Sequence, residues 1–209
     1  WVKIPNLSSL TDTDIYMYYD NPSATNQENA TDVWNSNFEM VQHLEETSGT
    51  HEDSTSNDND GTPSVGVTQD ATGQIGGADS FDGADDCIGV SGLSAPTNKT
   101  FSLWIYANAF SGNYNTLIEF ADDEPWFGLC LWKGAYYLLL SPDRWGSTAL
   151  STVPWYYVVY TSDNIENESK FYLDGVDDTD PNENTNANTD TGNGMGIAYH
   201  QGDEHFNGI

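Results

Sequence analysis

Two short stretches of this sequence are crowded with oxygen-bearing side chains that could bind a metal ion. The candidate ligands are Asp53, Asn57 and Asn59 in the loop His51–Gly61, and Asp79, Asp82 and Asp85 in the turn Asp79–Asp86. Ca²⁺ takes six to eight oxygen ligands from carboxylates, amides and carbonyls, so these residue types suit it. We therefore predict a structural divalent cation, calcium, between the loop and the turn. The alternative is that these acids only form part of a strongly acidic surface.

Aromatic side chains beside polar ones form a second candidate site, of the kind that binds sugars. Their rings offer large, rigid stacking areas at a small cost in conformational entropy. The candidates lie near turns or along expected strands, and they are Trp126, Trp132, Tyr136, Arg144 and Trp145. The alternative role for aromatic rings is packing in the core, and we predict that role for Trp104, Trp155, Tyr157 and Phe171.

The sequence lacks the residue patterns typical of an enzyme. Glycosidases on β-sandwiches place carboxylates along one strand in the pattern E-x-D-x-x-E. The nearest match, Glu119 followed by Asp122, Asp123 and Glu124, has the wrong spacing. The nucleophile motif G-x-S-x-G and the zinc motif H-E-x-x-H are also absent from the sequence. We therefore predict no catalytic residues and a protein that is not an enzyme.

The charge balance limits the partners of this 209-residue chain. It has 33 Asp and Glu against 5 Lys and Arg, a net charge of −28. Such a surface repels nucleic-acid phosphates and anionic membranes, so we expect neither as a partner. Aromatic residues make up 13% of the chain, which argues against disorder for most of it. The charge instead indicates a halophile, because the Debye length falls to roughly 3 Å in 1 M salt.

Further features bear on location and redox state. No stretch approaches the ~20 apolar residues that span a bilayer. Four N-x-S/T sequons begin at Asn6, Asn29, Asn98 and Asn167. We expect an extracellular or cell-surface protein. Cys87 and Cys130 each lie in an apolar run, where a thiol packs as a small hydrophobe; a disulfide between them is the alternative.

The elements that must position these residues have the pattern of β-strands. From Lys99 onward, apolar segments alternate with clusters of Gly, Pro, Asn or Asp at the spacing of a sandwich. The expected strands there are Phe101–Ala107, Asn115–Phe120, Phe127–Lys133, Ala135–Leu140, Trp155–Thr161 and Lys170–Leu173. Asp14–Tyr19 and Phe38–Leu44 also have strand composition, and Asp174-Gly175 indicates a tight turn. We predict an all-β sandwich of two antiparallel sheets.

Two motifs carry a resemblance to a known family. Phe81–Asp86 has the pattern F-D-G-x-D-D, and Tyr172–Gly175 reads Y-L-D-G. With their surroundings, they resemble the laminin G-like or concanavalin A-like lectin–glucanase jelly roll, over residues 34–209. The resemblance implies a jelly-roll fold, calcium, and a carbohydrate- or glycoprotein-binding module of a secreted or cell-surface protein. The alternative is a structural subunit of an extracellular assembly or filament.

Residues 1–33 resemble the end of a small domain of unknown function that often precedes this jelly roll. The pattern I-Y-x-Y-Y-x-N-P matches Ile15–Pro22. The family usually has one more strand beyond Ile209, paired with the first strand, here Phe38–Leu44. We therefore expect a jelly roll that lacks its last strand. We predict that Ile15–Tyr19 pairs with one of its sheets, in the same chain or in a second copy.

Overall fold

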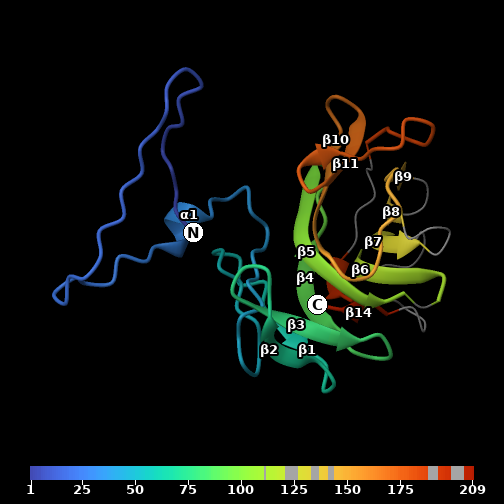
Figure 1. The fold of residues 1–209 in the computed structure, drawn as a ribbon, viewed down its shortest axis with the longest axis horizontal. Coiled ribbons are helices and arrows are strands. Elements are labelled where there is room, and N and C mark those ends of the chain that lie inside the picture. The colour runs from blue at the N-terminus through green and yellow to red at the C-terminus, as the bar shows by residue number, and fades with distance from the viewer. Residues whose placement is uncertain (111, 121–126, 133–136, 141–143, 188–192, 199–204) are drawn as a thin grey trace.

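In the computed structural model, two antiparallel sheets of seven strands each form a sandwich (Figure 1). The structure describes residues 1–110, 112–120, 127–132, 137–140, 144–187, 193–198 and 205–209. The first sheet has the order β1 (Gly61–Pro63), β4 (Ile88–Ser94), β13 (Asn193–Ile197), β6 (Tyr114–Phe120), β7 (Phe127–Trp132), β8 (Tyr137–Leu140), β9 (Arg144–Trp145). The second has the order β12 (Val176–Asp177), β11 (Glu168–Leu173), β10 (Trp155–Asp163), β5 (Lys99–Ala109), β14 (Asn207–Gly208), β3 (Gly77–Asp82), β2 (Thr68–Thr72). The prediction of an all-β, jelly-roll-like sandwich is confirmed.

The core lies between the two sheets and is made of alternate residues from each. The first sheet contributes Ile88, Val90, Leu129 and Leu131, and the second contributes Ile105, Val158, Tyr160 and Phe171. Side chains two apart on a strand point to the same face, so one line of residues per strand faces this core. Aromatic contacts join the layers, because Phe101 of the second sheet packs against Phe120 of the first in a tilted arrangement, with 5.8 Å between ring centroids.

The hairpin between β11 and β12 turns where the sequence indicated. Asp174 and Gly175 have φ angles of 51° and 81°. Two successive residues with positive φ match the right-handed twist of the strands they join, and Asp-Gly tolerates this conformation well. The predicted tight turn is therefore confirmed.

Three aromatic residues predicted for the core lie on the outer face of the second sheet instead. Trp104 pairs with Tyr157 across β5 and β10, and Trp155 is the third. Their neighbours Ile105 and Val158 are buried in the core, so these rings must point outward. The core prediction is wrong for the three rings, because the opposite face of β5 and β10, which carries Ile105, Val158 and Tyr160, is the buried one; it is correct for Phe171.

The segment Phe38–Leu44 is irregular, although strand composition predicted otherwise. Its backbone groups bind the following loop rather than a neighbouring strand. The Val41 amide donates to Asp53 Oδ1 at 2.9 Å, and the Val41 carbonyl accepts from the Ser54 amide at 2.9 Å. Met40 and Leu44 still pack against the core.

The segment Ile15–Tyr19 forms no strand and is exposed along its length, with Tyr18 at 93%. Figure 1 shows this part of the chain (blue) apart from the sandwich. Phe38–Leu44, beside which a vacant strand position was expected, forms no strand, and at the C-terminus β14 lies between β5 and β3, with Ile209 exchanging backbone hydrogen bonds of 2.7 and 2.8 Å with Tyr106. The predicted pairing of Ile15–Tyr19 within the chain is therefore wrong.

The fold also contains a short helix and two cysteines. Ala30–Val33 forms the short helix α1, which Asn29 caps by accepting from the Asp32 amide. No helix in the described part of the chain is long and apolar enough to cross a membrane. Cys87 and Cys130 do not form a disulfide with each other.

Candidate functional site

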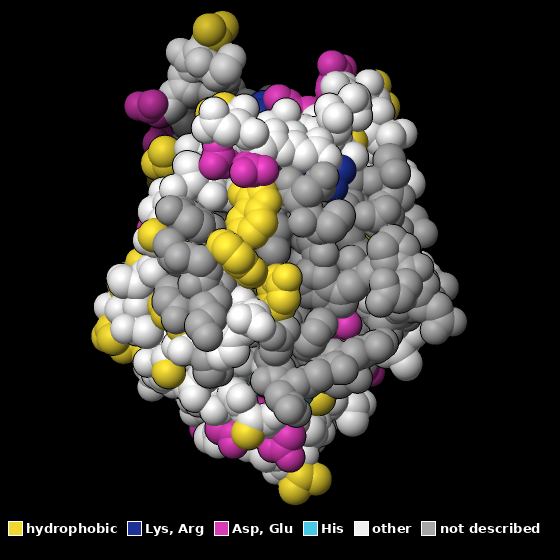
Figure 2. All heavy atoms as spheres, turned by 90° about the vertical axis from the view of Figure 1, so that its right-hand side faces the viewer, with side chains coloured by type: hydrophobic (Ala, Val, Ile, Leu, Met, Phe, Trp, Pro, Cys, Tyr) yellow, Lys and Arg dark blue, Asp and Glu magenta, His cyan; other side chains and the backbone are white. Residues whose placement is uncertain are grey.

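Two of the predicted ligand-binding tryptophans lie together at one edge of the first sheet. Trp132 ends β7 and Trp145 ends β9, and their ring centroids are 5.0 Å apart at an interplanar angle of 82°. Both side chains are partly exposed. The preceding residue, Leu131, is buried in the core, so Trp132 belongs to the outer face of the sheet. Figure 2 faces this side of the sandwich and shows a strip of hydrophobic side chains next to acidic ones.

Arg144, another predicted ligand residue, is mainly buried and holds a neighbouring segment in place. Its Nε donates to the Asn186 carbonyl at 2.9 Å, and its Nη2 donates to the Ala187 carbonyl at 3.0 Å. These bonds fix residues 186–187 beside β9 and its tryptophan. The other two predicted residues, Trp126 and Tyr136, lie outside the described residues.

A row with three glycines crosses the same outer face. Backbone pairing aligns Gly89 on β4 with Gly196 on β13, Gly196 with Glu119 on β6, and Glu119 with Gly128 on β7. Directly paired residues share a face, and Gly89 lies between the core residues Ile88 and Val90, so the row faces outward. Glycines leave the sheet surface bare of side chains where a ligand or another backbone comes close.

The row is open at the β4 end. Gly89 is exposed, and a methyl group built on it would meet nothing within 4 Å. A groove of about 450 Å³ lies here, over β1, β4 and β13, with Thr62 and Ser91 among its lining residues. At the other end, Gly196 and Gly128 are buried and Glu119 is only 1% exposed. The outer face therefore offers an open groove on β1, β4 and β13 and an aromatic pair on β7 and β9.

The predicted calcium ligands of the loop His51–Gly61 bind the protein itself. Asp53 Oδ1 accepts from the amides of Val41 and Thr55, and Oδ2 accepts from Thr55 Oγ1 and the Asn59 amide. A carboxylate has about four acceptor positions, so Asp53 has none left for an ion. Burial opposes its ionised form, but the hydrogen bonds from Val41, Thr55 and Asn59 outweigh burial and lower its pKa.

The two predicted asparagine ligands also bind backbone groups of residues 38–41; we call this set of hydrogen bonds between the loop and residues 38–41 the clasp. Asn57 Nδ2 donates to the carbonyls of Phe38 and Glu39, both at 3.1 Å. Asn59 Nδ2 donates to the Glu39 carbonyl at 2.7 Å. The loop therefore holds residues 38–41 in place, and Asp53, at its centre, does not fit a calcium site.

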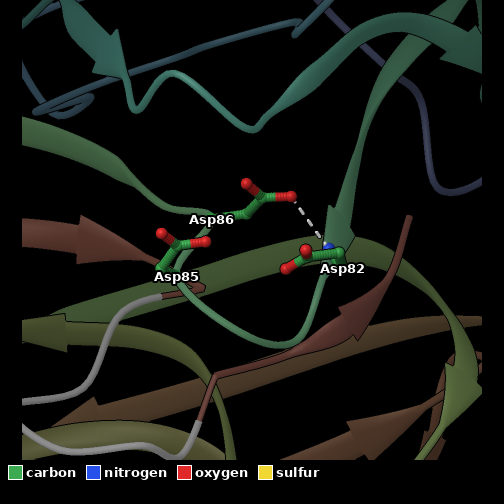
Figure 3. Close-up of side chains that lie close together, drawn as sticks. All are labelled: Asp82, Asp85 and Asp86. Atoms are coloured by element: carbon green, nitrogen blue, oxygen red, sulfur yellow. Dashed lines mark hydrogen bonds between the residues drawn. The ribbon is translucent and has the colours of Figure 1, made fainter.

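The predicted ligands of the second stretch are partly brought together. Asp82, Asp85 and Asp86 lie close together, with carboxylate oxygens within 4.8 Å of one another (Figure 3). Asp86, at the end of the predicted turn, is 2% exposed. Its Oδ2 accepts from the Asp82 amide at 2.9 Å, and its Oδ1 has no hydrogen-bond partner. These oxygens suit a hard cation such as calcium.

Asp79 belongs to a different, buried cluster. His51 is fully buried between two carboxylates: Nδ1 lies 2.8 Å from Glu46 Oε2, and Nε2 lies 2.7 Å from Asp79 Oδ2. Burial raises the pKa of Asp79 to about 6; the charge of His51 opposes this shift and that of Glu46 adds to it. For Glu46, burial is outweighed by hydrogen bonds from His51 and the Glu52 amide, which lower its pKa. This cluster ties the loop to β3, and no sequence motif pointed to His51 or Glu46.

The comparisons with known proteins agree with the fold. The model of a domain of unknown function (DUF2341) matches residues 1–59. No curated protein matches this chain in sequence. Domain 4 of AbnA, a GH43 extracellular arabinanase from Geobacillus stearothermophilus, solved in complex with arabinotriose, is similar over 75% of this chain and 82% of that domain, with a TM-score of 0.60 and 23% identity.

A second solved structure is similar in fold over a smaller share of its own length. The Trypanosoma rangeli sialidase, in complex with 2,3-difluorosialic acid, aligns over 78% of this chain and 28% of the sialidase, with a TM-score of 0.53 and 12% identity. At these identities, both likenesses show a shared β-sandwich.

Proposed function

We propose that this chain is a non-catalytic carbohydrate- or glycoprotein-binding module that holds its ligand on the outer face of the first sheet. The observation that carries the proposal is the Trp132–Trp145 pair, partly exposed on the same face as the glycine-lined groove. Partly exposed rings supply stacking area for sugar faces, and the bare sheet lets a flat ligand approach the backbone. The likeness to an arabinanase domain solved with arabinotriose supports the same class of ligand.

A neutral ligand suits the charge of this protein. With a net charge of −28, the surface repels polyanions at long range, whereas an uncharged sugar meets no such barrier. We also propose a secreted or cell-surface location in a halophile, which the acidic, lysine-poor composition supports.

Calorimetric titration with a panel of neutral oligosaccharides, arabinotriose among them, tests the proposal in molar NaCl. Replacing both Trp132 and Trp145 with alanine should lower the affinity for the oligosaccharide that binds at least tenfold, which is about 1.4 kcal/mol of binding free energy. Trp1→Ala is the matched control, since Trp1 is 76% exposed and lies in the N-terminal segment. Equal affinity of the double variant and the wild type would refute the assignment of this face.

We further propose that calcium binds at the turn of Asp82, Asp85 and Asp86. The unpartnered Asp86 Oδ1 supports this, because an unsatisfied buried carboxylate oxygen is costly unless a donor or cation approaches it. Calcium would act there as a structural ion that joins β3 to β4.

The second candidate function is a subunit of an extracellular assembly, and the exposed segment Ile15–Tyr19 favours it. This extended, apolar stretch could add to a sheet edge of a second copy. Size-exclusion chromatography with light scattering, across protein concentrations, would detect such association. Replacing Tyr16 and Tyr18 with serine should abolish it, and a monomer at all concentrations would exclude this function.

A further inference from the structure

The outer face of the second sheet carries aromatic rings that neither folding nor the first site explains. Trp104 pairs with Tyr157, and Tyr106 pairs with Trp155, across the adjacent strands β5 and β10. Their chain neighbours Ile105 and Val158 face the core, so all four rings lie on the opposite, outward face. This face is separate from the groove and the tryptophan pair, which belong to the other sheet.

The four rings form a compact block. The centroids of Trp104 and Tyr157 are 5.1 Å apart with planes at 37°, and those of Tyr106 and Trp155 are 5.5 Å apart with planes at 52°. Along each strand, the two ring-bearing residues are two positions apart, roughly 7 Å. All four side chains remain partly exposed, and Trp104 reaches 37%. Such a block of rings on a sheet is a flat stacking platform.

Polar but uncharged residues continue the platform along the strands. The next outward pair beyond Trp104 and Tyr157 is Ser102 with Val159, and Thr100 with Thr161 follows. Charged groups lie on the β11 side of the rings: Asp174 Oδ1 accepts from the Tyr157 amide at 2.9 Å, and Lys170, which pairs with Thr161, is bound to Glu168 at 2.9 Å. Along β5 and β10 the surface is thus apolar at the rings and hydroxyl-bearing next to them, a combination that suits sugars.

We propose that this aromatic platform is a second glycan-binding surface, which takes an extended neutral polysaccharide chain. A glycan chain presents alternating C–H faces and hydroxyl edges, which match rings and the hydroxyl groups beside them. The occupant is a neutral polymer rather than a polyanion, because the net charge of −28 repels polyanions and the rings and the hydroxyl-bearing residues next to them are uncharged. The proposal goes beyond the first site: with platforms on opposite sheets, one molecule would join two glycan chains.

The test uses the full chain in molar NaCl and measures its retention on insoluble neutral polysaccharides, with cellulose, chitin and insoluble arabinan as probes. Trp104→Thr combined with Tyr157→Thr removes the platform while keeping strand propensity. Trp104→Phe combined with Tyr157→Phe is the conservative control. We expect the threonine pair to weaken retention about tenfold and the phenylalanine pair to preserve it. Melting temperatures close to that of the wild type would show that both variants fold.

The outcome separates the two sites. If the double threonine variant loses polysaccharide retention but still binds oligosaccharides, the platform is a glycan site. This conclusion holds even if replacing Trp132 and Trp145 has no effect, which would refute only the first site. If retention is unchanged in the threonine pair, or if none of the three polysaccharides retains the wild type, the platform is not a glycan site. Dimerisation that only the threonine pair abolishes would identify the face as a contact between copies and would also overturn the proposal.

Discussion

Asp53 offers a direct test of whether the acidic loop acts through protein contacts or through an ion. The substitution is Asp53→Ala. It removes an acceptor that serves the amides of Val41, Thr55 and Asn59 and the Thr55 hydroxyl, from a residue only 8% exposed. Each buried donor left without a partner costs about 1–3 kcal/mol, and water can reach part of this loop. We therefore expect a loss of about 3–5 kcal/mol in the free energy of unfolding.

Urea unfolding in molar NaCl measures this loss, and thermal melting should show a decrease of at least ~6 °C. Glu52→Ala is the matched control, because it removes one exposed carboxylate from the same loop. Its effect should stay within about 0.5 kcal/mol. A loss below about 1 kcal/mol for Asp53→Ala would refute the clasp. A loss that disappears in EDTA would show that Asp53 acts through a metal ion.

The pH dependence of the same variant provides a further check. The folded pKa of Asp53 lies below its usual value of 3.8, so its carboxylate stabilises the protein above that pH. This stabilisation is lost as the pH falls through the lowered pKa. The free energies of unfolding of the wild type and Asp53→Ala should therefore converge in strong acid, and a constant difference would contradict the hydrogen-bond account.

The other predictions concern the buried histidine cluster, the acidic turn and salt. The folded pKa of Asp79, about 6, exceeds its usual 3.8, so the native state keeps a proton that the unfolded state releases. Wild-type stability should fall relative to Asp79→Asn as pH rises from 3.8 to 6; a constant difference would contradict this. Calcium should raise the melting temperature of the chelated wild type but not of Asp86→Asn, and equal responses would exclude the turn as its site. Increasing NaCl to molar levels should raise the melting temperature substantially; no change would contradict salt adaptation.

The sequence predicted the sandwich well because its strands have a strong local signal. In β5, β10 and β11, β-branched and aromatic residues are bounded by turn residues, and the Asp174-Gly175 turn follows from local conformation alone. Which face of β5 and β10 lies inside could not be predicted in this way. Both lines of residues in Phe101–Ala107 and Trp155–Thr161 contain large apolar side chains, so alternation does not distinguish them. The line with Phe101, Val158 and Tyr160 packs in the core, and the line with Trp104, Trp155 and Tyr157 is left outside.

The candidate site residues were harder to predict because their roles depend on contacts between distant segments. The spacing of Asp53, Asn57 and Asn59 is compatible with a metal loop, and only the position of residues 38–41 shows that these side chains bind backbone groups. The same holds for Asp86, whose buried oxygen lies against the loop of Gly66. Composition could identify these residues as oxygen ligands, but not the partner that each oxygen meets.

Salt adaptation and ligand binding depend on different residues of this fold. Acidic side chains lie in the loop His51–Gly61, in the turn Asp82–Asp86 and in residues 163–183, whereas the rings of the platform are uncharged and continue along β5 into Ser102 and Thr100. Salt screens repulsion between charges but has little effect on stacking between a ring and a neutral sugar. Salt should therefore act on the repulsion among acidic side chains, whereas a platform of neutral rings can bind a neutral ligand in molar salt.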